Sequence, residues 1–260
     1  MRILSYSFEA ALTLDAEVRD HSFVLRCEPA TVPGQTVLEA QTAITPPCHA
    51  ARQVDGFGSP LLVGSIEGPH RGFSFVSAGL VMVDRAGAPA PEPAHPIFSN
   101  PSALTRADEG IRAFTADVLR VCPNADPLSK AVKLSRALHE RMAYTPGSTD
   151  VSTTAAEAFG EGAGVCQDYA HILIAALRHT GAPARYVSGL IEGEGATHAW
   201  VEVHDGEAWR GVDPTNDRLV DDGYIMLAHG RDFSDCPIER GVFRGSAAQA
   251  QTVKVTVGDR

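Results

Sequence analysis

The sequence predicts an α+β protein in two parts. An N-terminal antiparallel β-sandwich or barrel is expected over residues 1–90, followed over residues 97–260 by a domain in which helices precede an antiparallel sheet. Before residue 85, β-branched and aromatic residues are dense and helical periodicity is weak, which favours strands. After residue 96, apolar residues first recur at helical spacing and then alternate, which indicates helices and then strands.

Four segments of the first part are expected to be strands. Turn signals such as Pro33-Gly34 and Asp55-Gly56 separate them. The expected strands cover residues 22–27, 36–45, 60–66 and 72–83. A proline-rich stretch over residues 86–96 favours extended polyproline II structure and marks the expected boundary between the two domains.

The second part is expected to begin with helices. Apolar residues from Leu104 to Val118 follow helical spacing, and Asp126-Pro127 has the pattern of an N-cap followed by an N1 proline. Thr154 and Glu157 have capping-box spacing, which predicts a short helix closed by Gly160. Another helix is expected to start near Cys166 and to end before Pro183.

Strands are expected to follow these helices. They cover residues 184–191, 198–204 and 207–213, with a final alternating strand over residues 252–257. Asp205-Gly206 is a strong signal for a hairpin turn between the second and third of them.

Composition excludes several classes of function. The chain of 260 residues has 22 Lys and Arg against 32 Asp and Glu, giving a formal net charge of −10. This charge argues against binding to duplex nucleic acid and against docking on anionic lipid. No apolar run approaches the roughly 20 residues of a membrane helix, and no signal peptide is recognised, so a cytoplasmic location is expected.

The five cysteines are expected to be free thiols, because they are odd in number and form no CxxC pair. For Cys27, Cys48, Cys122 and Cys236, burial as a small apolar side chain is the better interpretation.

Cys166 differs from the other cysteines because it stands at an expected helix start, after Gly162 and Gly164. Free N–H groups and the helix dipole favour a thiolate there, and the thiolate is the nucleophilic form of cysteine. The backbone N–H of Cys166 could also donate to a developing oxyanion. The sequence therefore predicts a nucleophile at Cys166.

A base and an orienting carboxylate are expected from the hairpin. If the turn has two residues, 204 lies opposite 207, and His198 then lies opposite Asp213. An aspartate beside a histidine fixes the imidazole tautomer and supports the imidazolium. His171 is a rival base by proximity, but at i+5 it does not share a helix face with Cys166, so a structural role is expected.

The residue types allow two further interpretations. A zinc site at Cys166, His198 and Asp213 is conceivable from the ligand types, but the chain has no short-spaced ligand pair, so no metal is expected. Asp168 and Arg185 are proposed to form a structural ion pair between the cysteine helix and the next strand.

Three blocks of sequence resemble the core motifs of the transglutaminase-like superfamily. They read GVCQDYAHILIAALRHTGAPARYVSG, THAWVEV and WRGVDPTND, and they lie in the family's order within residues 150–217. DGFGS and the tail LAHGRDFSDCPIERGVFRG resemble, more loosely, the bacterial transglutaminase-like cysteine peptidases that carry an N-terminal bacterial transglutaminase-like β domain. In DGFGS, Ser59 stands where relatives commonly have asparagine.

The resemblance implies a papain-like α+β core with a Cys-His-Asp triad at Cys166, His198 and Asp213. The implied chemistry is acyl transfer through an acyl-thioester, with no metal or cofactor and with a peptide or protein as substrate. A peptidase or amidase acting on peptide or isopeptide bonds is expected. A protein-glutamine transglutaminase and a non-catalytic binding or scaffold protein remain alternatives.

Overall fold

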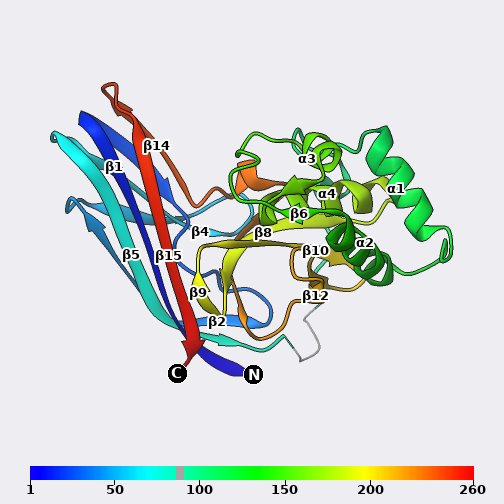
Figure 1. The fold of residues 1–260 in the computed structure, drawn as a ribbon. Coiled ribbons are helices and arrows are strands. Elements are labelled where there is room, and N and C mark those ends of the chain that lie inside the picture. Colours follow the sequence, from blue (N-terminus) through cyan, green and yellow to red (C-terminus); the bar gives the residue numbers. More distant parts are fainter. Residues whose placement is uncertain (86–90) are drawn as a thin grey trace.

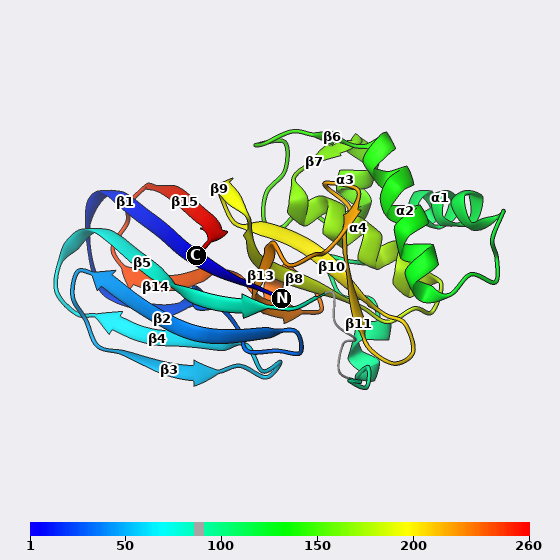
Figure 2. The same cartoon turned by 90° about the horizontal axis from the view of Figure 1, so that it is seen from below.

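The computed structural model describes residues 1–85 and 91–260 and shows three layers (Figure 1). A curled antiparallel sheet of long strands forms one side, a second sheet lies in the middle, and helices cover the far face of the second sheet. The view from below shows the same order of layers (Figure 2). The predicted α+β class is confirmed, and the predicted sandwich or barrel takes the form of one curled sheet.

The first sheet is organised around one very long strand, β1. Its first half pairs with β5 and β15, its second half pairs with β4 and β14, and the register shifts between the two halves. Alternate side chains of β1 are buried, which is the pattern of a strand with one face on a core. The strands of this sheet are β1 (Arg2–Leu25), β2 (Gln35–Thr45), β3 (Ala50–Val54), β4 (Pro60–Ile66), β5 (His70–Val83), β9 (Gly193–Gly195), β14 (Glu239–Arg244) and β15 (Gln249–Asp259).

The end of the chain returns to this first sheet. The strand expected over residues 252–257 exists as β15, but it pairs with β1 and not with the second sheet. Its expected place in the second sheet is therefore wrong, because an alternating pattern specifies a strand and a buried face but not the partner strand. The division at 1–90 and 97–260 stays a prediction; residues 86–90, where the first domain was expected to end, lie outside the described residues.

The helices begin and end close to where local signals predicted. Asp126 caps α2 by accepting a hydrogen bond from the Ser129 N–H at 2.9 Å, and Thr154 and Glu157 form the expected capping box. The left-handed residue after α3 is Gly162, not the predicted Gly160. The helices are the 3₁₀ turns η1 (Pro96–Ser99) and η2 (Phe233–Asp235), and α1 (Glu109–Leu119), α2 (Pro127–Arg141), α3 (Ala155–Glu161) and α4 (Cys166–His179).

The second sheet has the strand order β12-β11-β10-β8-β13. Ala184, Tyr186 and Val201 pack with α4 in one core, and Leu190, Ile225 and Leu227 belong to the core of the first sheet. Its strands are β8 (Ala184–Ile191), β10 (His198–His204), β11 (Trp209–Asp213), β12 (Arg218–Leu219) and β13 (Tyr224–Gly230). A short parallel pair, β6 (Ala143–Tyr144) and β7 (Ala163–Gly164), lies just before α4 in the fold.

The two sheets are joined near the start of β10. The loop between β8 and β10 contains β9, which pairs with β15 of the first sheet, so that Gly195 lies opposite Val255. Arg2 binds Glu192, at the start of this loop, through two hydrogen bonds of 2.8 and 2.6 Å. The first sheet therefore holds the segment that leads into His198.

The DGFGS block and the tail block LAHGRDFSDCPIERGVFRG also meet in the fold. The His229 N–H donates to the Ser59 hydroxyl at 3.2 Å, which joins the DGFGS turn to β13. No helix in the described part of the chain combines the length and apolar character needed to cross a bilayer.

Candidate functional site

Cys166 is the first residue of α4, as the sequence predicted, and its side chain is partly exposed. The Asp168 carboxylate fixes this helix start, because its Oδ2 accepts from the Val165 N–H at 2.7 Å and from the Thr149 hydroxyl at 2.6 Å. A Cβ at Gly164 would lie 2.7 Å from the Asp168 side chain, so glycine is required for this close approach.

The proposed ion pair between Asp168 and Arg185 is wrong. Arg185 donates instead to Glu202 at 2.7 Å and to Glu92 at 3.0 Å. Arg185 and Glu202 lie directly opposite each other on β8 and β10. The neighbours of Arg185 on β8 pack toward α4, so its own side chain lies on the other face of the sheet, away from Asp168.

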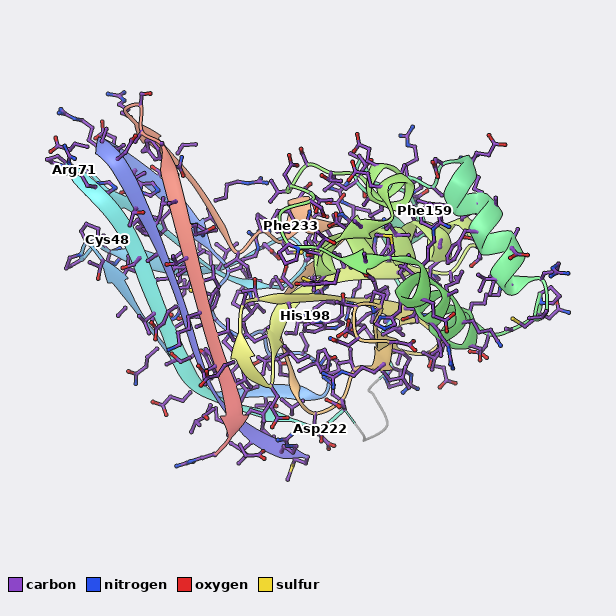
Figure 3. All side chains as sticks on the ribbon, in the orientation of Figure 1. Cys48, Arg71, Phe159, His198, Asp222 and Phe233 are labelled. Carbon is purple, nitrogen blue, oxygen red and sulfur yellow. The ribbon has the colours of Figure 1, made fainter. Side chains whose placement is uncertain are left out.

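His198 is the first residue of β10, and its side chain is 11% exposed. Its Nε2–H donates to Asp213 Oδ2 at 2.7 Å, and the Cys166 sulfur lies near enough to the ring to contribute to the raised pKa of His198. Because the carboxylate occupies Nε2, Nδ1 is the nitrogen left for the thiol. Figure 3 shows His198 in the middle of the molecule, between the curled sheet and the helices.

The pKa of His198 reflects these neighbours. Burial disfavours the imidazolium and lowers the pKa, but hydrogen bonds and charge interactions with Asp213 and Cys166 outweigh burial and raise the pKa to about 9. The imidazolium is thus the favoured form at neutral pH, which is the form that stabilises a neighbouring thiolate.

The hairpin register differs from the predicted one. His204 lies opposite Trp209, so the loop has four residues rather than two. The Asp205 carboxylate closes this loop by accepting from the backbone N–H groups of Glu207 and Ala208 at 2.9 Å. The register is shifted by two residues, and because side chains alternate with a period of two, the shift keeps His198 and Asp213 on one face.

Asp213 is fully buried and accepts hydrogen bonds on both oxygens. Oδ1 accepts from the backbone N–H groups of Thr215 and Asn216 at 3.0 and 3.2 Å. Oδ2 accepts from His198, from the Asn216 amide and from the Tyr224 hydroxyl, each at 2.7 Å. Burial alone would raise the pKa of Asp213, but these donors lower it, so the carboxylate stays ionised.

Tyr224, Asn216 and Arg218 are neighbours of Asp213 that sequence reasoning missed. Arg218 Nε donates to the Tyr224 hydroxyl at 2.6 Å, so this hydroxyl is free to direct its own proton to Asp213. Asn216 could have been found from the sequence, because an amide three residues after an aspartate is well placed to bond it. Tyr224 comes from another strand and carried no local signal.

The other candidate groups take structural places. The His171 ring is fully buried and its Nε2 accepts from the Phe233 N–H at 3.1 Å, and burial lowers its pKa to about 4. Burial raises the pKa of Cys27 to about 12 and also raises that of Cys236. Among the described residues, no group of three or more His, Cys, Asp or Glu side chains is arranged to hold a metal ion.

Comparison with family models gives two matches. The model of the transglutaminase-like superfamily matches residues 114–214, which include Cys166, His198 and Asp213. The model of the bacterial transglutaminase-like N-terminal region matches residues 4–82.

Similar proteins include two from mycobacteria. An uncharacterized protein of Mycobacterium leprae is 28% identical over 251 residues, covering 89% of this chain and 90% of that protein. An uncharacterized protein of Mycobacterium tuberculosis is 32% identical over 237 residues, covering 75% of this chain and 73% of that protein. A protein-glutamine gamma-glutamyltransferase of Pseudomonas aeruginosa is 33% identical over 135 residues, 46% of this chain and 19% of that protein.

One similar solved structure covers the whole chain. The crystal structure of a candidate cysteine protease from Cytophaga hutchinsonii aligns with a TM-score of 0.81 at 22% identity, over 100% of this chain and 91% of that one. The two chains therefore share their fold from end to end.

Proposed function

Because the chain belongs to the transglutaminase-like superfamily, we propose that it is a cysteine-dependent acyl-transfer enzyme, a peptidase or amidase that hydrolyses peptide or isopeptide bonds. One observation carries the proposal. The His198 ring is bound by the buried Asp213 carboxylate at 2.7 Å, and the nearby Cys166 sulfur contributes, with Asp213, to the raised pKa of the ring. A nucleophile, a base and a group that orients the base are the minimum that nucleophilic acyl transfer needs.

In the proposed reaction, the Cys166 thiolate attacks the carbonyl carbon of the substrate, and the carbonyl electron pair moves onto oxygen. The Cys166 N–H, which has no acceptor within its helix, is placed to donate to that oxyanion. When the C–N bond breaks, protonated His198 gives its proton to the leaving amine, and an acyl-thioester remains on Cys166.

Hydrolysis then releases the acyl group. Neutral His198 removes a proton from an attacking water, and the second tetrahedral intermediate expels the Cys166 thiolate. Throughout the cycle Asp213 holds the Nε2–H of His198, so that Nδ1 stays directed at the reacting atoms. If an amine attacks in place of water, the same intermediate gives transamidation.

Tyr144 is the proposed substrate contact at the mouth of the site. It lies on β6, which pairs with the strand that leads to Cys166, and its side chain is 56% exposed. Partial burial and the charge of the nearby Cys166 sulfur raise the pKa of Tyr144. Substrate that reaches the sulfur would pass this ring.

Hydrolysis is favoured over amine transfer because the fold likeness to the Cytophaga hutchinsonii candidate cysteine protease spans the whole chain. The likeness to the Pseudomonas aeruginosa gamma-glutamyltransferase covers less than half of it. That second likeness nevertheless makes protein-glutamine transglutamination the second candidate function. The substrate is proposed to be a peptide or protein, and the cytoplasmic location expected from the sequence stays a prediction.

Two experiments test this proposal. Limited alkylation with iodoacetamide at mildly acidic pH should modify Cys166 before the other four thiols, and Cys122→Ser should leave that order unchanged. Equal labelling of all thiols would favour a non-catalytic scaffold. A peptide and acyl-amide library should be turned over by the wild type and by Cys122→Ser but not by Cys166→Ser. Product masses with and without added primary amine then separate hydrolysis from transamidation.

A further inference from the structure

A cavity of about 230 Å³ lies on the face of the second sheet opposite α4. Its walls come from residues 32–34 and 84–85 on one side and from β8, β10, β11 and β13 on the other. None of Cys166, His198 and Asp213 lines it, so it is distinct from the candidate active site. Its volume is below the roughly 300–1,000 Å³ of pockets for drug-sized ligands, so its occupant is small.

A second hollow adjoins the cavity beside Arg85. This more open hollow of about 380 Å³ is lined by Arg2, Asp221 and Asp222 together with Arg85 and Val220. Arg85 and Val220 line both hollows and therefore lie between them. Asp222, to which the Arg85 backbone N–H donates at 2.6 Å, is at the lower edge of the molecule in Figure 3.

The charged groups in the wall are unequally paired. Arg185 forms ion pairs with both nearby glutamates, Glu202 at 2.7 Å and Glu92 at 3.0 Å. Arg210 is paired with Asp205 at 2.6 Å. The carboxylate of Asp84, also in the wall, lies 3.4 Å from the N-terminal amine.

Arg85 is the poorly partnered cation among the described wall residues. The carboxylate nearest to its guanidinium is that of Glu202, whose Oε1 lies 3.9 Å away and is too distant for a hydrogen bond, while its Oε2 is bound by Arg185 at 2.7 Å. One Arg85 Nη donates to Gln35 Oε1 at 3.3 Å, while the buried Nε–H has no hydrogen-bond partner. The side chain is only 13% exposed, so water does not compensate fully, and an unsatisfied charged donor is costly to bury.

The remaining wall is apolar and aromatic. Val32, Leu219, Val220 and Met226 line it beside Trp209, whose ring carries the Arg185 guanidinium 4.2 Å from its centroid. The Arg85 guanidinium lines the cavity and supplies a positive charge with N–H donors in a planar fork, which suits a small anion such as a carboxylate. An apolar body attached to the carboxylate would then pack on the aliphatic wall.

We propose that this cavity binds a small organic carboxylate, with the carboxylate on the Arg85 guanidinium and an apolar body against Val220, Leu219 and Met226. The site does not depend on the proposed enzymatic function. The cavity adjoins β11 and β12, which carry Asp213 and Arg218. Its ligand binding depends on the charge of Arg85 and on the shape of the apolar wall, and not on the candidate active site.

The test compares benzoate with benzamide, a neutral molecule of nearly the same shape, by isothermal titration of the full chain. Benzoate is expected to bind at least about tenfold more tightly than benzamide, because only benzoate gains charge-assisted hydrogen bonds from Arg85. Inorganic phosphate, which has the charge but no apolar body, is expected to bind more weakly than benzoate.

Variants assign the binding to this cavity. Arg85→Met should weaken benzoate binding by at least about tenfold, and Arg85→Lys, which keeps the charge without the fork, should fall between it and the wild type. Arg112→Met, on the exposed face of α1, should leave benzoate binding unchanged. Equal affinity for benzoate and benzamide, full benzoate binding by Arg85→Met, or no benzoate binding up to its solubility limit would overturn the proposal. The first and third of these outcomes are measured on the wild type, so the proposal can be refuted even if Arg85→Met fails to fold.

Discussion

The substitution Asp213→Asn isolates the contribution of one oxygen to the site. The side chain keeps its shape, and its remaining oxygen can still accept from the backbone N–H groups of Thr215 and Asn216. The atom that faces His198 changes from a charged acceptor to an amide, or the amide must flip and lose its backbone bonds. In either case the imidazolium loses the buried carboxylate that holds it.

The expected magnitude follows from the pKa of His198. The rise from 6.5 to about 9 corresponds to roughly 3 kcal/mol of extra stabilisation of the imidazolium, shared between Asp213 and Cys166. Burial acts in the opposite direction, so without the carboxylate we expect the pKa of His198 to fall to 6.5 or below. A rate loss of about 10³–10⁴-fold is expected for any acyl transfer, by analogy with the same change in a serine protease triad.

The assay needs no known substrate. An NMR titration of the His198 imidazole between about pH 5 and 10.5 should give a pKa near 9 in the wild type and at or below 6.5 in Asp213→Asn. Asp205→Asn is the matched control, because Asp205 also accepts backbone N–H groups at a strand end but lies outside the site. If the pKa of His198 is unchanged in Asp213→Asn, the reasoning about the carboxylate is refuted.

The same variant should show a pH signature in stability. The folded pKa of His198 lies above its unfolded value, so its contribution is complete below pH 6.5 and is lost as pH rises through about 9. The difference in unfolding free energy between wild type and Asp213→Asn is therefore expected to be largest near about pH 6, at roughly 2–3 kcal/mol, and to shrink above about pH 9. Urea denaturation at both pH values measures it, and a difference that grows with pH would contradict the assignment.

Three further substitutions test the frame around the site. Tyr224→Phe removes one donor to Asp213 Oδ2 and should cost about 1–2 kcal/mol in chemical denaturation, with a fall in turnover; no loss of either would contradict its positioning role. Gly164→Ala forces a methyl group against the side chain that caps α4 and should cost about 1–3 kcal/mol and most activity, whereas a fully active variant would show that the helix start tolerates displacement. Glu202→Gln leaves Arg185 buried beside only one carboxylate and should cost about 3–5 kcal/mol in thermal or urea unfolding, and a loss below about 1 kcal/mol would contradict the pairing.

Local signals explain which elements the sequence could predict. The helix starts at Pro127 and Ala155 are set by side chains within three residues, and the structure confirms both caps. β13 was missed because its residues, YIMLAHG, are buried throughout and contribute to the cores of both sheets. A strand buried on both faces shows no alternation, so periodicity does not reveal it.

Long-range pairing could not be predicted from local patterns. β15 alternates as expected, but nothing in TVKVTV specifies that its partner is β1, more than 200 residues earlier. The hairpin register failed for a related reason. Asp205-Gly206 indicates a turn, but the two N–H groups that bind the Asp205 carboxylate extend the loop to four residues.

The candidate site was predictable to the extent that its residues lie on one hairpin and one helix start. His198 and Asp213 share a face for any even shift of register, so the interpretation survived an error of two residues. Tyr224, which donates to Asp213 from β13, reaches it through tertiary packing and lay outside what spacing could show.

The most direct test of the central claim is to trap the acyl-thioester. Brief reaction with an activated peptidyl ester, followed by acid quench and peptide mapping by mass spectrometry, should place the acyl group on Cys166 alone. The adduct should disappear with time in wild type, form far more slowly in His198→Gln, and be absent in Cys166→Ser. Acylation spread over the other thiols, or at the same rate without His198, would contradict the claim that the thiol, the imidazole and the carboxylate work as one acyl-transfer centre.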